Sequence, residues 1–75
     1  MDLYKTLCEE EGKEMSLESL AIKAKNINKT DAKMVAKCMI EIMAKLKYDS
    51  RIATKYTISG SGLKTIIYIK ERYFL

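Results

Sequence analysis

Apolar residues recur at three- and four-residue steps between residues 30 and 47. The repeated positions are Ala32, Val35, Cys38, Met39, Ile42, Met43 and Leu46. This spacing places the apolar side chains on one face of a helix. No Gly or Pro interrupts the segment, and Asn28 or Thr30 can offer a side-chain oxygen to cap its first turn. The pattern therefore predicts an amphipathic helix over about residues 30–47.

Two shorter helical patterns come before this segment. Asp2 can cap a first helix over about residues 2–11, and Ser16 can cap a second over about residues 16–25. Between them Met15 is an isolated apolar residue. We expect Met15 to form a brief strand that adds to a later hairpin.

After residue 51 the apolar period changes from 3.6 to 2, which is typical of strands. Residues 52–58 and 63–70 alternate in this way, and the Ser59–Gly62 segment between them is a strong turn signal. A four-residue loop pairs Ile58 with Leu63 and, at the other end, Ile52 with Ile69. The core side of this hairpin is then predicted to carry Ile52, Tyr56, Leu63, Ile67 and Ile69. The outer side is predicted to carry Lys55, Thr57, Lys64, Ile66 and Tyr68.

The charges are divided unevenly along the chain, whose net charge is +4. Residues 1–18 hold two Lys against six Asp and Glu, which is −4. Residues 19–75 hold twelve Lys and Arg against four Asp and Glu, which is +8. A basic region of this size attracts polyanions and gives salt-dependent binding. We expect the acidic start to point away from the same surface.

Length and composition restrict the class of protein. The 75 residues fit one domain, residues 1–75, with charge and apolar content typical of a globular chain. No stretch reaches the roughly 18 apolar residues of a membrane span, and the first residues lack the basic-then-apolar layout of a signal peptide. We therefore expect a cytoplasmic (intracellular) protein that does not bind membranes.

The residue types also argue against catalysis and metal binding. The chain has no His and no Cys-x-x-Cys spacing, so it offers no zinc ligand set and no nucleophile–base pair. We expect no enzyme activity, no metal and no cofactor. For Cys8 and Cys38 we favour two buried thiols in a reducing interior over a disulfide.

The order of elements is helix, short strand, helix, turn, longer helix, then a hairpin with a glycine-rich tip. This order resembles the winged helix-turn-helix family from residue 2 to about residue 70. The resemblance implies an α+β fold in which the third helix enters the DNA major groove and the hairpin forms a wing on the DNA backbone. It implies that the DNA-binding residues are Lys23, Lys25, Asn28, Lys29, Lys33, Lys37, Lys55, Ser59, Ser61 and Lys64.

These residues have separate expected roles. Asn28, Lys29, Lys33 and Lys37 lie on the groove side of the third helix, whereas Lys23 and Lys25 flank it as phosphate contacts. The wing supplies Lys55, Ser59, Ser61 and Lys64. The expected groove face has no Arg or Gln, so we predict sizeable non-specific affinity and modest direct base reading. The alternative for these lysines is a solvated face that serves solubility alone.

The function we expect is therefore double-stranded DNA binding, sequence-specific or semi-specific, by a small regulator of transcription. The alternative is a winged-helix module for protein–protein contacts, such as an adaptor or an inhibitor of a host enzyme; the acidic first helix and the outward Ile66 and Tyr68 fit it. A third possibility is RNA binding, with Tyr56 and Tyr68 as stacking residues.

Several apolar residues on a small domain, together with an exposed edge strand, predict a two-fold homodimer. Its expected interface is Ile40, Ile66, Tyr68, Tyr73, Phe74 and Leu75. Such a dimer would present two recognition helices about 34 Å apart, one DNA turn. The alternative is a C-terminal tail that folds back on its own core.

Overall fold

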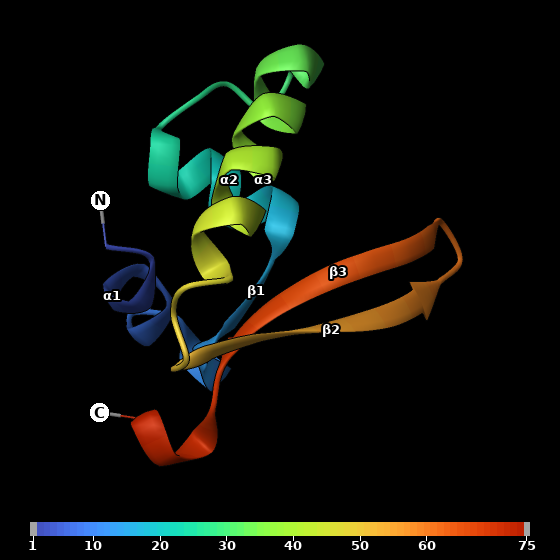
Figure 1. Cartoon of the computed structure of the whole chain (residues 1–75). Helices are drawn as coiled ribbons and strands as arrows, with labels where there is room; N and C mark the ends of the chain where they lie inside the picture. The colour runs from blue at the N-terminus through green and yellow to red at the C-terminus, as the bar shows by residue number, and fades with distance from the viewer. Residues whose placement is uncertain (1, 75) are drawn as a thin grey trace.

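The structure is a computed structural model that describes residues 2–74, and Figure 1 shows its elements. It is a small α+β domain with three helices and a C-terminal antiparallel β-hairpin. In chain order the elements are α1 (Leu3–Cys8), the 3-10 turn η1 (Glu11–Lys13), β1 (Glu14–Ser16), α2 (Leu17–Lys25), α3 (Ala32–Leu46), β2 (Ile52–Ser59), β3 (Gly62–Ile69) and the 3-10 turn η2 (Glu71–Tyr73).

The three strands form one antiparallel sheet in the order β1-β3-β2. Ile58 lies opposite Leu63 and Ile52 lies opposite Ile69, which confirms the register predicted from the loop length. Met15 pairs with Ile67, so the brief added strand is confirmed as well. β3 is the central strand, and the edges of the sheet are β1 and β2.

Short polar side chains start the helices. Oδ1 of Asp2 accepts the backbone N–H of Tyr4 at 3.0 Å, and Oγ of Ser16 accepts that of Ser19 at 3.1 Å, as predicted. Each bond satisfies a backbone donor that has no partner within its helix. The first helix ends at Cys8 and not near residue 11, because the backbone at Glu10 is already extended.

The start of α3 differs from the prediction. Its cap is Asp31, whose Oδ1 accepts the backbone N–H of Met34 at 3.2 Å. Asn28 is occupied elsewhere, since its Oδ1 accepts both the backbone N–H of Thr30 at 3.0 Å and the Thr30 hydroxyl at 2.8 Å. This local Asx turn holds the chain out of the helix until Asp31.

The core lies between the three helices and the half of the sheet nearest to them. Its most deeply buried side chains are Leu7, Leu20, Ile42, Ile67 and Ile69. The prediction that the hairpin's whole inner side is buried was wrong, because Tyr56 is 62% exposed and Leu63 is 71% exposed. Figure 1 shows the reason: the far half of the hairpin extends beyond the helices, so no element covers it.

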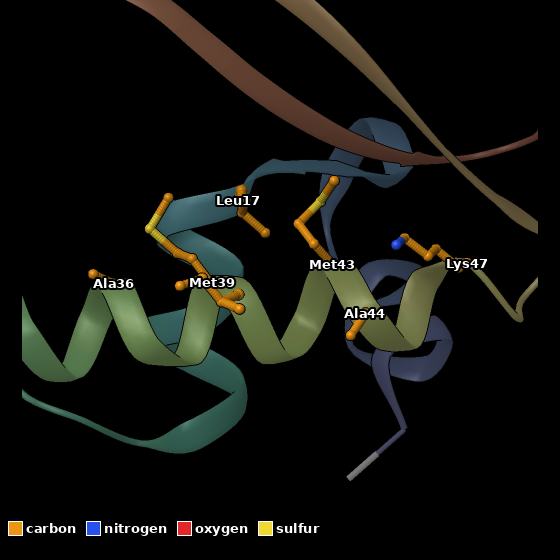
Figure 2. Close-up of a pocket in the computed structure, with 7 residues that line it drawn as sticks. Leu17, Ala36, Met39, Met43, Ala44 and Lys47 are labelled. Carbon is orange, nitrogen blue, oxygen red and sulfur yellow. The ribbon is translucent and has the colours of Figure 1, made fainter.

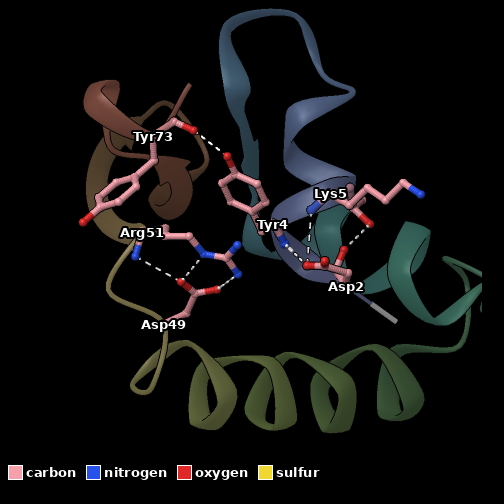
Figure 3. Close-up of polar contacts among 7 residues, drawn as sticks. Asp2, Tyr4, Lys5, Asp49, Arg51 and Tyr73 are labelled. Carbon is pink, nitrogen blue, oxygen red and sulfur yellow. Dashed lines mark hydrogen bonds and ion pairs between the residues drawn. The ribbon is translucent and has the colours of Figure 1, made fainter. Parts of the chain in front are cut away.

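A polar cluster joins the base of the hairpin to α1 and to the end of the chain (Figure 3). Arg51 donates to both carboxylate oxygens of Asp49, at 2.9 and 2.8 Å, and its guanidinium lies 4.0 Å from the centre of the Tyr4 ring. The hydrogen bonds from Arg51 hold the pKa of the Asp49 carboxyl below its ordinary value. The Tyr4 hydroxyl donates to the carbonyl of Tyr73. These contacts hold η2 against the body of the molecule.

Candidate nucleic-acid interface

Three lysines lie at the start of α3 and in the turn before it; we call Lys29, Lys33 and Lys37 the α3 lysine face. All three are exposed, and neither Lys33 nor Lys37 is covered by the chain's own hairpin. They are placed outward because the opposite side of α3 is held in the core by buried residues, among them Val35 and Cys38. None of the ion pairs found within residues 2–74 involves them.

The other predicted cationic contacts are mostly paired with carboxylates. Nζ of Lys23 lies 2.9 Å from Glu10, Nζ of Lys25 lies 3.5 Å from Glu41, and Nζ of Lys55 lies 2.9 Å from Glu14. The hydrogen bond to Glu10 raises the pKa of Lys23. Exposed ion pairs of this kind are weak, so a phosphate could replace the carboxylate. They nevertheless contribute less positive potential than the α3 lysine face.

The predicted wing residues lie at and near the hairpin tip. The hydroxyls of Ser59 and Ser61 are 3.0 Å apart, and Ser59 also donates to the Gly62 carbonyl at 3.3 Å. Lys64 is exposed. Lys55 lies on the outer face of the sheet, where its Nζ is 5.2 Å from the ring centre of Tyr68. Lys55 therefore faces away from the core side of the sheet, whereas Lys64 lines a hollow that also includes Met39 of α3.

Asn28 is the one amide predicted close to the α3 lysine face, and part of its side chain is already hydrogen-bonded within the chain. Its carboxamide oxygen accepts two hydrogen bonds from Thr30. Reading adenine by an amide requires the oxygen and the NH2 group together. The Asx turn thus removes the bidentate contact while it persists, and the remaining lysines favour phosphates over base edges.

The residues of the predicted dimer interface differ in their exposure to solvent. Ile40 is 73% exposed and Phe74 is 46% exposed, whereas Ile66 and Tyr68 are half-buried. Leu75 lies outside the described residues. Tyr73 packs against the molecule's own core, as the folded-back tail predicts.

An apolar groove on α3 was not found by the sequence analysis (Figure 2). Its volume is ≈ 550 Å³, with Lys47 at its edge. The apolar lining residues are Leu17, Ala36, Met39, Ile40, Met43 and Ala44. The signal in the sequence was a second stripe, Ala36, Ile40 and Ala44, at four-residue steps beside the core stripe.

Leu17 and Met39 also line a second hollow of ≈ 270 Å³, which reaches Leu63 and Thr65 on the hairpin. The two hollows therefore adjoin at Leu17 and Met39, and the second is also lined by the polar residues Ser16, Glu18, Ser61 and Lys64. We call the two hollows together the α3–hairpin trough.

Within residues 2–74 no three or more metal-ligating side chains of His, Cys, Asp or Glu gather at one place. In the same part of the chain, no helix combines the length and the apolar character needed to cross a membrane.

Comparisons with protein-family models, with curated proteins and with solved structures return no match to this chain. A functional assignment therefore depends on the order of the elements and on the surface chemistry described above.

Proposed function

We propose that this protein is a winged helix-turn-helix regulator of transcription that binds double-stranded DNA. In this arrangement α3 is the recognition helix and the β2–β3 hairpin is the wing. The observation that supports the proposal most directly is the α3 lysine face, whose three cations are exposed and make no ion pair within residues 2–74. Phosphate binding there would displace no carboxylate of the described chain.

The charges and the missing residue types define the kind of DNA binding we propose. Lys33 and Lys37 are one helical turn apart, so both side chains can reach one groove of the duplex. Lysine neutralises phosphates well but lacks the planar fork with which Arg reads guanine. The proposed binding therefore draws most of its free energy from phosphate contacts and is strongly reduced by salt.

The first test measures the affinity for duplex DNA by fluorescence anisotropy at several salt concentrations. Each phosphate contact adds about 0.9 to the slope of log K against log salt. The double variant Lys33→Ala, Lys37→Ala is expected to bind more weakly and to lose roughly 2 from that slope. The matched control, Lys5→Ala with Lys45→Ala, removes the same charge elsewhere on the exposed surface.

The control variant is expected to keep most of the affinity. If the native chain shows no salt-sensitive binding to duplex DNA, the proposal fails. It also fails if both double variants bind equally well, because the position of the charge would then not matter. Selection of bound duplexes from a random pool at two salt concentrations would measure how much base specificity accompanies the phosphate contacts.

The apolar α3 part of the trough supports a second candidate function, a module for protein–protein contacts. Such a surface is unusual for a site that binds only phosphates, since DNA interfaces are polar and positively charged. A stoichiometric complex with another protein that is indifferent to nucleic acid would favour this candidate over the first.

A further inference from the structure

The inner side of the hairpin carries large apolar side chains past the point where the core ends. Tyr56, Ile58 and Leu63 follow the alternation of the buried Ile52 and Ile67, so they point to the same face of the sheet. They are nevertheless 62%, 88% and 71% exposed. A protein that stayed a monomer would leave this apolar surface in water.

The same part of the hairpin is also free of charge. The segment from Tyr56 to Leu63 contains no Asp, Glu, Lys or Arg, in a chain of which 32% is charged. Natural proteins usually place charges, particularly Lys, on exposed edge strands to prevent pairing with other chains. The far half of β2 lacks this protection, which is typical of a surface that another molecule covers.

The larger hollow of the trough, which lies on α3, has the same apolar character as this surface. Figure 1 shows the hairpin projecting away from the helices. The hairpin residues Leu63 and Thr65 line the smaller hollow together with polar side chains, Glu18 and Lys64 among them, whereas the larger hollow is mainly apolar. Its α3 wall is formed by residues such as Met39 and Ile40, the latter 73% exposed. An uncharged apolar projection and an apolar groove on α3 thus occur on one chain.

The accessible area gives the size of the surface to be covered. The chain exposes 5329 Å², whereas a compact monomer of 8.6 kDa exposes about 4,700 Å². The excess is about 600 Å². A stable interface of ordinary size buries roughly 800 Å² on each partner, and smaller ones somewhat less. The uncovered surface is therefore close to what one side of a dimer requires.

We propose that the α3–hairpin trough is occupied by a second copy of this chain. Two copies pack about a two-fold axis, so that Ile58 and Leu63 at the hairpin tip of each copy lie in the trough of the other, against Ile40. A two-fold arrangement uses the same patch on both subunits, so that patch must contain both the projecting side chains and the hollow that receives them. This chain carries both. This interface keeps Ile40 from the one predicted from sequence, but it uses the inner side of the hairpin in place of the outer Ile66 and Tyr68 and the C-terminal residues.

The dimer does not depend on DNA binding. Lys33 lies seven residues before Ile40, and therefore on the same side of α3, while Lys37 follows the lining residue Ala36. The two lysines thus border the proposed interface at the N-terminal end of α3. The experiments below contain no DNA, and their outcome therefore does not depend on whether the proposed function is correct.

The first experiment measures the mass of the native chain and of two variants by sedimentation equilibrium. Native protein at roughly 100 µM is expected to be a dimer, since an interface of this size typically gives micromolar affinity or better. Ile58→Asp and Ile40→Lys are each expected to raise the dissociation constant at least about tenfold, because each places a charge in the apolar contact. Both residues are exposed in the monomer, so the fold is expected to survive, as far-UV circular dichroism would verify.

The control variant is Tyr48→Lys. Tyr48 is 91% exposed and does not line the trough, so the same change from apolar to charged is expected to leave the dimer intact. Loss of the dimer in this variant would show that added charge alone causes dissociation, which would overturn the proposal.

The second experiment mixes the two interface variants. A heterodimer of Ile40→Lys and Ile58→Asp has one native contact, and in its other contact the Lys faces the Asp. The mixture is therefore expected to dimerise more strongly than either variant does alone.

Three further results would overturn the proposal: a native chain that is a monomer at this concentration, a dissociation constant that either variant leaves unchanged, or a mixture that dimerises no more strongly than the separate variants. A dimer lost in Ile58→Asp alone would indicate pairing of two β2 edges instead.

Discussion

The two halves of the β2–β3 hairpin have the same backbone pairing and the same alternation of side chains, yet they differ completely in burial. Near the base, Ile52, Ile67 and Ile69 are at most 6% exposed. Toward the tip, Ile58 and Leu63 are 88% and 71% exposed on the same face of the sheet. Burial changes along a strand whose pattern does not change.

The difference shows that alternation determines which face a side chain joins, while the reach of neighbouring elements determines whether that face is buried. The helices cover only the base of the hairpin (Figure 1). At the base, the Asp49–Arg51 pair and the contact of Arg51 with Tyr4 add further support (Figure 3). The tip has no such partner within residues 2–74, and this is the surface to which we assign a second copy.

The largest expected effect comes from truncating one apolar residue in each half. Ile67→Ala removes a fully buried side chain, and we expect it to lower the free energy of unfolding by about 2–5 kcal/mol. Leu63→Ala, on the same face of the same strand, is expected to change it by less than about 0.5 kcal/mol. Urea denaturation would measure both, at a protein concentration low enough to keep the chain monomeric.

Equal losses in the two variants would contradict the comparison, because the tip would then be as closely packed as the base. A third measurement would sharpen it. At concentrations where the native chain dimerises, Leu63→Ala is expected to become destabilising, since its partner surface is then present.

The periodic patterns were sufficient to predict the architecture. The three helices, the added strand at Met15 and the register from Ile52–Ile69 to Ile58–Leu63 all appear as expected. Each follows from interactions between residues close in sequence: a helical or strand period, a capping oxygen, or a four-residue loop. Such local signals can be read without knowing the tertiary packing.

The errors concern properties that depend on other parts of the chain. Tyr56 and Leu63 were placed in the core because the sequence does not show where the helices end in space. The sequence likewise did not show that Lys55 pairs with Glu14, a residue about forty positions away; its phosphate contact stays a prediction. The cap of α3 was assigned to Asn28 or Thr30 instead of Asp31. All three residues carry a side-chain oxygen that can accept a backbone N–H at the start of a helix, and the sequence alone does not show which of them does so.

The next effect, smaller than that of Ile67→Ala, tests the support at the base of the hairpin. The pKa of Asp49 is lowered from its ordinary value of 3.8, chiefly by hydrogen bonds from Arg51. A carboxyl whose pKa is depressed in the folded state contributes stability above its unfolded pKa, and that stability is lost as the pH falls through the folded value. The native chain is therefore expected to lose stability as the pH falls from about 5 through 3.8 and below.

Asp49→Asn is expected to be less stable at neutral pH and to show a shallower decline over the same range, as thermal unfolding at several pH values would measure. Glu11→Gln provides the control, since Glu11 is exposed and makes no ion pair within residues 2–74. If stability falls by the same amount at low pH in Asp49→Asn and in the native chain, the Asp49–Arg51 pair does not stabilise the base of the hairpin.

The smallest expected effect concerns two glycines at the tip. Gly62 has φ +114°, a conformation that side chains with a Cβ rarely adopt, whereas Gly60 is not in that region and has no heavy atom within 4 Å of an added Cβ. We expect Gly62→Ala to weaken the tip by about 1 kcal/mol, and Gly60→Ala to leave it unchanged or slightly more stable. Amide hydrogen exchange would resolve the effect by position.

In Gly62→Ala the amides around Ile58 and Leu63 are expected to exchange faster, while those at Ile67 and Ile69 keep their protection. This separation follows if the tip can open without disturbing the core that holds the base. Faster exchange along the whole of β3 would instead show that the two halves of the hairpin unfold as one unit. The two halves would then have the same local stability although their burial differs.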